Sequence, residues 1–173
     1  MFEQNKKNQL ALDSLKFFKD QNKVLNYIEK NRIICFEINA LSIDKPIIKL
    51  IEVIKKYLIG EKINLYEEIA YLNLKLEIKS KFNSEFSQKV ILWILNNLKY
   101  GQVMSYCEIG KKINSKAYRA IGNILKNNPF PLIIPCHRVI RNNGEIGGFM
   151  GKNDKSWEQN IKKKLLTLEG LEL

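Results

Sequence analysis

Residues 128–140 read Asn-Pro-Phe-Pro-Leu-Ile-Ile-Pro-Cys-His-Arg-Val-Ile and contain three of the four prolines of the chain. Proline fixes the φ angle and lacks the N–H that a sheet ladder needs. The stretch therefore predicts a stiff, extended, largely apolar passage that delivers Cys136 to a fixed place. His137, the single histidine of the sequence, follows directly.

A cysteine beside a histidine is a candidate nucleophile, because a neighbouring base or positive charge lowers the pKa of a thiol from about 8.5. Arg138 and Arg141 could contribute to such an environment. Adjacent residues of an extended chain point to opposite sides, so Cys136 and His137 would meet through a sharp turn or a bridging water, and we favour the water. The alternative is a buried structural cysteine beside a satisfied core histidine.

A glycine-rich loop and a final helix follow. Four glycines fall between positions 144 and 151, which predicts tight turns or a close approach of backbone N–H groups to a ligand. Ser156 predicts the start of a helix that Gly170 ends. Its apolar face holds Trp157, Ile161, Leu165 and Leu168. Glu169 lies at the helix end, where the macrodipole opposes a carboxylate, so it either pairs with His137 or is simply solvated.

A basic helical hairpin is predicted upstream. Ser105-Tyr106-Cys107-Glu108 has the form of a capping box and predicts a helix to Lys112, and Ser115 predicts the cap of a second helix over 116–126. The pair is a candidate helix-turn-helix. Ala120 and Gly122 are small enough to allow close approach to a DNA groove or to another helix. The basic side chains are Lys111, Lys112, Lys116, Arg119 and Lys126, although a merely solvated face is the alternative.

The first half of the chain predicts a small α/β unit. Residues 33–38 and 72–78 suggest strands, and residues 46–58 a helix ended by Gly60. The pattern turns helical at Ser84 and that run ends at Tyr100-Gly101. We therefore place a boundary near 80–83, with domains over 1–81 and 82–173.

Composition and charge narrow the class of protein. The chain has 173 residues, of which 45% are hydrophobic, so disorder and fibrous repeats are excluded. Its net charge of +11 favours a polyanionic partner such as nucleic acid, and the second domain is the more basic. No apolar run is long enough to span a membrane. Three widely spaced cysteines without a signal peptide predict a reduced, cytoplasmic protein, with Cys35 and Cys107 structural and no metal site.

Several of these motifs together resemble the O6-alkylguanine-DNA alkyltransferase family. The resemblance rests on Asn128-Pro129, on Pro135-Cys136-His137-Arg138-Val139 and on the ending Leu168-Glu169-Gly170, and it covers about residues 84–173. The motif that opens with Gly101 and the helix containing Arg119-Ala120-Ile121-Gly122 belong to it as well. It implies an α/β fold, with a small N-terminal ribonuclease-H-like domain and a C-terminal winged-helix-like domain that binds DNA.

The resemblance implies stoichiometric DNA repair without a cofactor. Cys136 would take the alkyl group from O6 of guanine in double-stranded DNA and remain alkylated, and we expect a monomer. His137 would deprotonate Cys136 through a water, and Glu169 would orient His137. The other implied roles are support of the turn (Asn128), nucleotide rotation (Tyr106), filling of the vacated stack (Arg119), further DNA contacts (Ser105, Lys116, Ala120, Gly122) and a substrate pocket (Val139, Phe149, Met150, Gly151).

The sequence departs from the family pattern in detail, and other classes of protein explain its motifs less completely. The 33-residue step from Cys136 to Glu169 is longer than expected, and Met150 and Tyr118 stand where smaller or polar residues are more usual. A non-catalytic alkylguanine sensor would lack the cysteine. A winged-helix regulator would leave the Cys-His segment unexplained, and a cysteine hydrolase would leave the basic helices unexplained.

Overall fold

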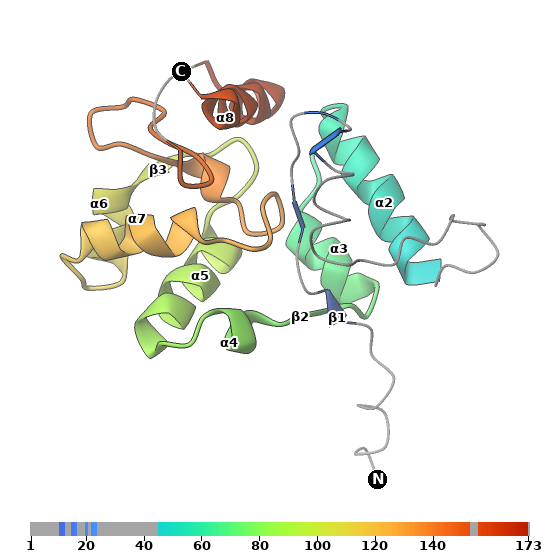
Figure 1. Cartoon of the computed structure of the whole chain (residues 1–173), viewed down its shortest axis with the longest axis horizontal. Helices are drawn as coiled ribbons and strands as arrows, with labels where there is room; N and C mark the ends of the chain where they lie inside the picture. The colour runs from blue at the N-terminus through green and yellow to red at the C-terminus, as the bar shows by residue number, and fades with distance from the viewer. Residues whose placement is uncertain are drawn as a thin grey trace, which may run out of the picture.

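The computed structural model describes residues 11–12, 15–16, 20, 22–23, 45–152 and 156–172. Helices dominate this part of the chain: α2 (Lys45–Leu58), α3 (Leu65–Tyr71), α4 (Ile78–Lys81), α5 (Glu85–Asn97), α6 (Tyr106–Lys112), α7 (Tyr118–Lys126) and α8 (Trp157–Leu168). Two short parallel pairings join β1 (Ala11–Leu12) to β2 (Lys75–Leu76) and β3 (Met104–Ser105) to β4 (Val139–Ile140). In Figure 1, α2 and α3 lie on one side and α5 to α8 on the other.

The helix predicted over 46–58 is confirmed as α2. It buries Leu50 and Tyr57, which are seven residues apart and therefore on the same face. The strand predicted over 72–78 is wrong for most of its length, since only Lys75–Leu76 pairs and α4 already begins at Ile78. Asn73 has a φ of +54°, a left-handed conformation that interrupts an extended chain. The strand predicted over 33–38, with Cys35, lies outside the described residues.

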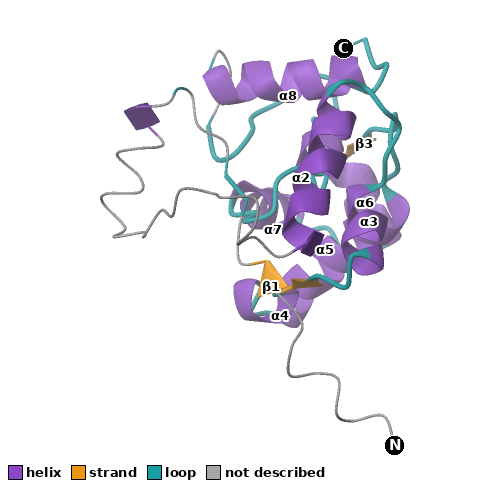
Figure 2. Ribbon diagram, turned by 90° about the vertical axis from the view of Figure 1, so that its right-hand side faces the viewer, coloured by secondary structure: helices purple, strands orange, loops and turns teal. Residues whose placement is uncertain are grey.

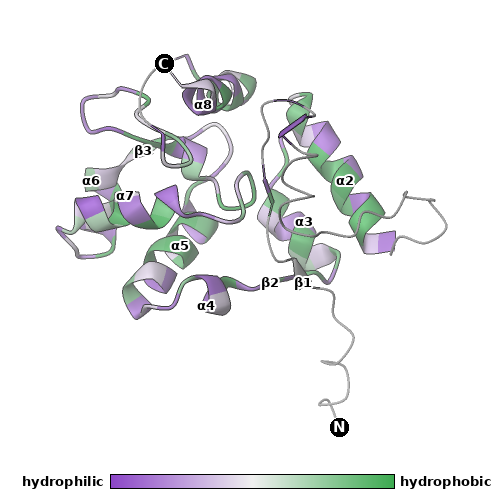
Figure 3. Ribbon diagram, viewed as in Figure 1, coloured by the Kyte–Doolittle hydropathy of each residue, from purple (hydrophilic) through white to green (hydrophobic). Residues whose placement is uncertain are grey.

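Helix α5 runs through the hydrophobic core. The helical pattern predicted from Ser84 is confirmed, and Ser84 is the N-cap, sharing reciprocal hydrogen bonds with Ser87. One face buries Val90, Ile91, Ile94 and Leu95. Figure 3 shows hydrophobic residues along most of this helix. Because α5 contacts α7, it gives the helical hairpin a fixed support.

The hairpin of α6 and α7 forms, with one correction. The predicted capping box of Ser105 and Glu108 starts α6. The second helix begins at Tyr118 rather than at residue 116, and Ser115 does not cap it. The Ser115 hydroxyl instead accepts a hydrogen bond from the Ala117 N–H, which makes a local turn before the helix. Gly110 lets the helices meet, since a Cβ there would lie 2.5 Å from the Tyr118 ring.

The last helix, α8, is capped by Ser156 as predicted, and Gly170 follows it with a φ of +80°. Figure 2 shows α8 lying across one end of α2. The result is a mixed α/β fold in which the end of α8, the end of α2 and residues 128–140 come together. In the described part of the chain, no helix has both the length and the apolar character needed to cross a membrane.

Candidate active site

Cys136 opens a short 3-10 helix, η1 (Cys136–Arg138), and is buried. The extended geometry predicted for this point is wrong, because the chain turns there instead of continuing straight. Cys136 also lines a cavity of about 300 Å³ together with Tyr106, Phe149, Met150 and Gly151. The predicted nucleophile therefore lies at a cavity large enough for a small organic group.

Asn128 holds the turn that carries Cys136. Its Nδ2 donates to the Ile134 carbonyl at 3.0 Å and to Cys136 Sγ at 3.1 Å, and its Oδ1 accepts from the Phe130 N–H. Burial raises the pKa of the Cys136 thiol, although the Asn128 hydrogen bond acts in the opposite direction. The resting sulfur is therefore a thiol, and it needs a base to become a nucleophile.

His137 is fully buried, and its two ring nitrogens differ in their surroundings. Nε2 lies 2.9 Å from Glu169 Oε1 and 3.1 Å from the Tyr57 hydroxyl oxygen. Within the described part of the chain, Nδ1 is buried without a hydrogen-bond partner. An ionised carboxylate only accepts hydrogen bonds, so Nε2 carries the hydrogen and Nδ1 keeps its lone pair. Burial lowers the pKa of His137, which leaves the ring neutral and able to accept a proton.

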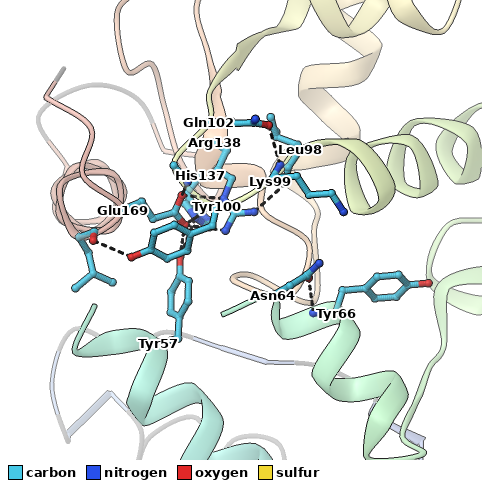
Figure 4. A network of polar contacts seen from close by, with 12 residues as sticks. Tyr57, Asn64, Tyr66, Leu98, Lys99, Tyr100, Gln102, His137, Arg138 and Glu169 are labelled. Atoms are coloured by element: carbon cyan, nitrogen blue, oxygen red, sulfur yellow. Dashed lines mark hydrogen bonds and ion pairs between the residues drawn. The ribbon is translucent and has the colours of Figure 1, made fainter. Parts of the chain in front are cut away.

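Glu169, the C-cap residue of α8, is buried and fully engaged (Figure 4). Arg138 donates to both carboxylate oxygens, through Nε at 2.9 and 3.1 Å and through Nη2 at 2.8 Å. The Gly101 N–H donates to Oε2 at 3.0 Å. Burial alone would raise the pKa of Glu169, but hydrogen bonds from His137 and Arg138 and the charge of Arg138 lower it to about 2. Glu169 is therefore a carboxylate, and the predicted pairing with His137 is confirmed despite the long intervening segment.

The sequence analysis did not predict Tyr57 or Lys162 as residues of this site. It named Arg138 only as a possible contributor of positive charge near Cys136. Tyr57 reaches His137 and Glu169 from α2, and Arg138 binds Glu169 and the Leu98 carbonyl. Lys162 is fully buried. Its Nζ donates to the carbonyls of Val139, Ile146 and Gly148, at 2.6, 2.6 and 3.4 Å.

A signal for two of these residues was present in the helical pattern. Lys162 precedes the buried Leu165 and Leu166 by three and four residues, so it shares their face, where a charge needs a partner. Tyr57 lies on the buried face of α2, where its hydroxyl needs one too. Periodicity identifies such positions but not the groups that they bind.

Three of the four residues predicted to form the substrate pocket lie together at one cavity. Phe149, Met150 and Gly151 line the cavity beside Cys136. Val139 is not among the lining residues, because its side chain is buried in the core and its carbonyl accepts from Lys162. Met150 has a φ of +48°, which is uncommon for a side chain of its size and marks a sharp turn at the cavity wall.

The residues predicted to bind DNA differ in how exposed they are to solvent. Arg119 on α7 and Lys116 just before it are exposed, and Ala120 is half-buried. Tyr106, Arg119 and Gly122 line one surface hollow together with Arg141. Ser105 does not belong to this surface, because it is buried and its hydroxyl bonds to Glu108.

Tyr106 links that hollow to the Cys136 cavity, since it lines both. Burial raises the pKa of its hydroxyl, and the neighbouring Cys136 raises it further. Tyr106 therefore stays protonated and can donate a hydrogen bond. A Cβ at Gly122 would lie 3.8 Å from the Tyr106 ring, an ordinary van der Waals contact, so Gly122 lies directly beside this ring.

A buried cysteine at a cavity wall, a buried His137–Glu169 pair and an exposed basic helical hairpin are the features of a DNA-binding protein with a candidate reactive cysteine. The family described as 6-O-methylguanine DNA methyltransferase, DNA binding domain, matches residues 85–171. A methylated-DNA–protein-cysteine methyltransferase of Pyrococcus horikoshii is 30% identical over 165 residues, covering 92% of this chain and 81% of that protein. The chain belongs to the methylated-DNA–protein-cysteine methyltransferase family.

Other relatives and solved structures are matched over a smaller part of their length, or are similar in fold alone. The protein of the same name from Cricetulus griseus is 40% identical over 87 residues, which are half of this chain and 39% of that relative. The structure of Mycobacterium tuberculosis OGT in complex with DNA aligns with a TM-score of 0.54 and 31% identity, covering 69% of this chain and 63% of that one. The O6-methylguanine-DNA methyltransferase of Pyrococcus kodakaraensis aligns over 94% of this chain and 100% of its own, with a TM-score of 0.59 and 22% identity.

Proposed function

We propose that this protein repairs DNA by moving an alkyl group from O6 of guanine to Cys136, once per molecule. The observation that carries the proposal is a buried Cys136 at the cavity wall, followed in the chain by a buried histidine that is hydrogen-bonded to Glu169. Membership of the family and the names of its relatives support the same reaction. No cofactor is required, because the thiolate itself accepts the group.

The first step is removal of the proton from the Cys136 thiol. Glu169 holds Nε2–H of His137, which leaves the Nδ1 lone pair for the proton. A water between Nδ1 and Sγ would pass the proton from the thiol to the ring, as expected for a general base that acts at a distance. The imidazolium that forms is stabilised by the Glu169 carboxylate.

The second step is displacement at the alkyl carbon. The Cys136 thiolate forms the S–C bond as the C–O6 bond breaks, and the electron pair of that bond leaves with guanine. The Tyr106 hydroxyl at the cavity wall, which keeps its proton, would donate a hydrogen bond to the departing guanine anion, and the anion would then take a proton from water. The thioether has no leaving group, so the protein is not regenerated.

The third element is access to the base, because a guanine stacked in a duplex cannot reach a buried sulfur. We propose that the target nucleotide rotates into the cavity with the help of Tyr106, and that Arg119 fills the space it leaves. Arg119 is exposed, long and planar, which suits stacking between bases. In the cavity, the Met150 N–H would face O6, and the carbonyls of Cys136 and Val139 would face the guanine amine, with Val139 shared with Lys162.

The wider organisation of the molecule is part of the proposal. We assign residues 1–81 to a ribonuclease-H-like domain and residues 82–173 to a winged-helix-like domain, with double-stranded DNA bound by the second. Its α6 and α7 hairpin and exposed basic residues support that choice. The protein would act as a monomer in the cytoplasm.

The test is mass spectrometry of the protein after mixing with a duplex that contains one O6-methylguanine. The expected result is a gain of one methyl group on the peptide that holds Cys136, stoichiometric with protein and absent from Cys136→Ser. A duplex with unmodified guanine is the second control. Tight binding to the lesion without transfer would identify a sensor, and equal binding to both duplexes would identify a DNA-binding regulator; either outcome would overturn the proposal.

A further inference from the structure

We infer that Tyr57 is a positioning residue, whose hydroxyl, brought from α2, fixes the Glu169 carboxylate and holds His137 in the tautomer that can take the Cys136 proton. The inference rests on the proposed function and extends it to the N-terminal part of the chain. Tyr57 lies 80 residues before His137 and 112 before Glu169, so only the docking of α2 brings it to this site.

The contacts of the Tyr57 hydroxyl carry the argument. It lies 2.5 Å from Glu169 Oε1 and 3.1 Å from His137 Nε2, and Tyr57 has no exposed surface. Figure 4 shows the ring rising from α2 with its hydroxyl directed between these two side chains. Burial raises the pKa of Tyr57 far above its usual range, and the Glu169 charge raises it further. The hydroxyl keeps its proton and donates it to the carboxylate.

The direction of the Tyr57–Glu169 hydrogen bond decides which kind of group, donor or acceptor, lies next to His137 Nε2. With its one hydrogen committed to Glu169, the Tyr57 oxygen presents only lone pairs to Nε2. Glu169 Oε1 also presents lone pairs, so both neighbours of Nε2 are acceptors. A ring with hydrogen on Nδ1 would place three lone pairs against one another. The pair of acceptors therefore keeps the hydrogen on Nε2 and leaves Nδ1 free to act as the base.

Tyr57 also differs from the other partners of Glu169. Arg138 comes from η1 and Gly101 from the segment after α5, both within the part of the chain that matches the family's DNA-binding domain. Tyr57 comes from outside that match. Through this one hydroxyl, correct seating of α2 becomes a condition for reactivity of Cys136.

Tyr100, whose ring packs against that of Tyr57, provides a matched control residue. Its ring packs edge-on against Tyr57, with centroids 6.0 Å apart. Its hydroxyl donates to the Leu168 and Gly60 carbonyls rather than to His137 or Glu169. Tyr57→Phe and Tyr100→Phe thus each remove one hydroxyl from this contact, and only the first touches the proposed base.

The experiment compares two reactions of the full chain, for the wild type and both variants. The first is the single-turnover rate of methyl transfer from an O6-methylguanine duplex. The second is the pH profile of Cys136 alkylation by iodoacetamide, read on the Cys136 peptide. The titratable and charged groups that act on His137 are Glu169, Arg138, Lys162 and Tyr57, and the three other than Tyr57 are unchanged in both variants.

The expected result is specific to Tyr57→Phe. Loss of one buried hydrogen bond corresponds to about a five- to tenfold slower transfer at neutral pH. Without a fixed base the buried thiol keeps its raised pKa, so the midpoint of the iodoacetamide profile should move up by about half a unit or more. Tyr100→Phe should stay within about twofold of the wild type with an unchanged midpoint. Equal profiles for the two variants would overturn the inference.

A double-mutant cycle separates positioning from general loss of packing. If Tyr57 acts through Glu169, Tyr57→Phe should have little further effect in a Glu169→Gln background. Full additivity would contradict that role. If the wild type takes no methyl group, the proposed function fails, whereas the iodoacetamide comparison still decides the role of Tyr57.

Discussion

Glu169 and His137 are 32 residues apart in the sequence, yet Glu169 Oε1 lies 2.9 Å from His137 Nε2 inside the protein. Both side chains are completely shielded from solvent. The carboxylate is ionised and only accepts hydrogen bonds, so this contact selects the ring nitrogen that keeps its lone pair. Helix α8, which ends at Leu168, brings the Glu169 that follows it back to His137.

Glu169→Gln should slow methyl transfer by about a hundredfold, because the general base loses the charge that orients and stabilises it. The single-turnover rate on an O6-methylguanine duplex measures this loss. Glu145→Gln is the control, since Glu145 forms an exposed pair with Arg141 and should leave the rate unchanged. A rate for Glu169→Gln close to that of the wild type would show that His137 does not depend on Glu169.

The same carboxylate should make stability sensitive to acid. Its pKa is about 2 in the folded protein against 4.5 for an unperturbed glutamate. Between these values the unfolded chain binds more protons than the folded one, so acid favours unfolding. The contribution is fully present above about pH 4.5 and is lost as the pH falls toward 2. Urea unfolding at pH 5, 4 and 3 should show the advantage of wild type over Glu169→Gln shrinking; a constant difference would contradict the low pKa.

Gly101→Ala should destabilise the protein and slow transfer. Gly101 has a φ of +71°, and a Cβ there would lie 3.2 Å from the Glu169 carbonyl oxygen, next to the N–H that binds Oε2. The backbone conformation alone costs an alanine about 1–2 kcal/mol. Gly144→Ala is matched for this cost, since Gly144 has a φ of +84° with nothing within 4 Å. Thermal unfolding of both variants should show the larger loss for Gly101→Ala, and equal losses would mean that the close approach does not matter.

Lys162→Met should loosen the glycine-rich loop. It removes the donor from the carbonyls of Val139, Ile146 and Gly148 and is expected to cost about 3 kcal/mol of unfolding free energy, because hydrogen bonds from a charged group are strong. Lys163→Met, at an exposed position of the same helix, is the control. Urea unfolding measures the difference, and an unchanged midpoint for Lys162→Met would show that the loop holds its shape without this lysine.

Arg119→Ala should separate DNA handling from the chemistry at sulfur. Arg119 is exposed on α7 and lies outside the Cys136 cavity, so its loss should slow transfer from duplex DNA by about tenfold, as expected for one lost stacking contact. Transfer from a free O6-alkylguanine base should be unchanged. Lys89→Ala removes an exposed positive charge from α5 and controls for net charge. Equal losses on duplex and free base would instead place Arg119 in support of the cavity.

The sequence by itself determined the features that depend on neighbours in the chain. Capping at Ser84, Ser105 and Ser156 fixes where three helices begin, since a cap needs only the next three residues. The segment from Asn128 to Val139 predicted the nucleophile and its histidine and carried the resemblance to the family. Local rules failed at Ser115, where the hydroxyl makes a turn instead of a cap, and at Asn73, where one left-handed residue broke a predicted strand.

Only the tertiary structure decided which partners the buried polar side chains of the site bind. Arg138 is adjacent to the motif, but only the fold shows that its guanidinium is committed to Glu169 rather than to Cys136. Tyr57 and Lys162 could be predicted as buried from their places on apolar helix faces, but not their partners. A buried hydroxyl or ammonium must be satisfied, and which acceptor satisfies it depends on how distant elements pack. The sequence therefore predicts the reacting group, and the packing of α2 and α8 decides which side chains surround the histidine beside it.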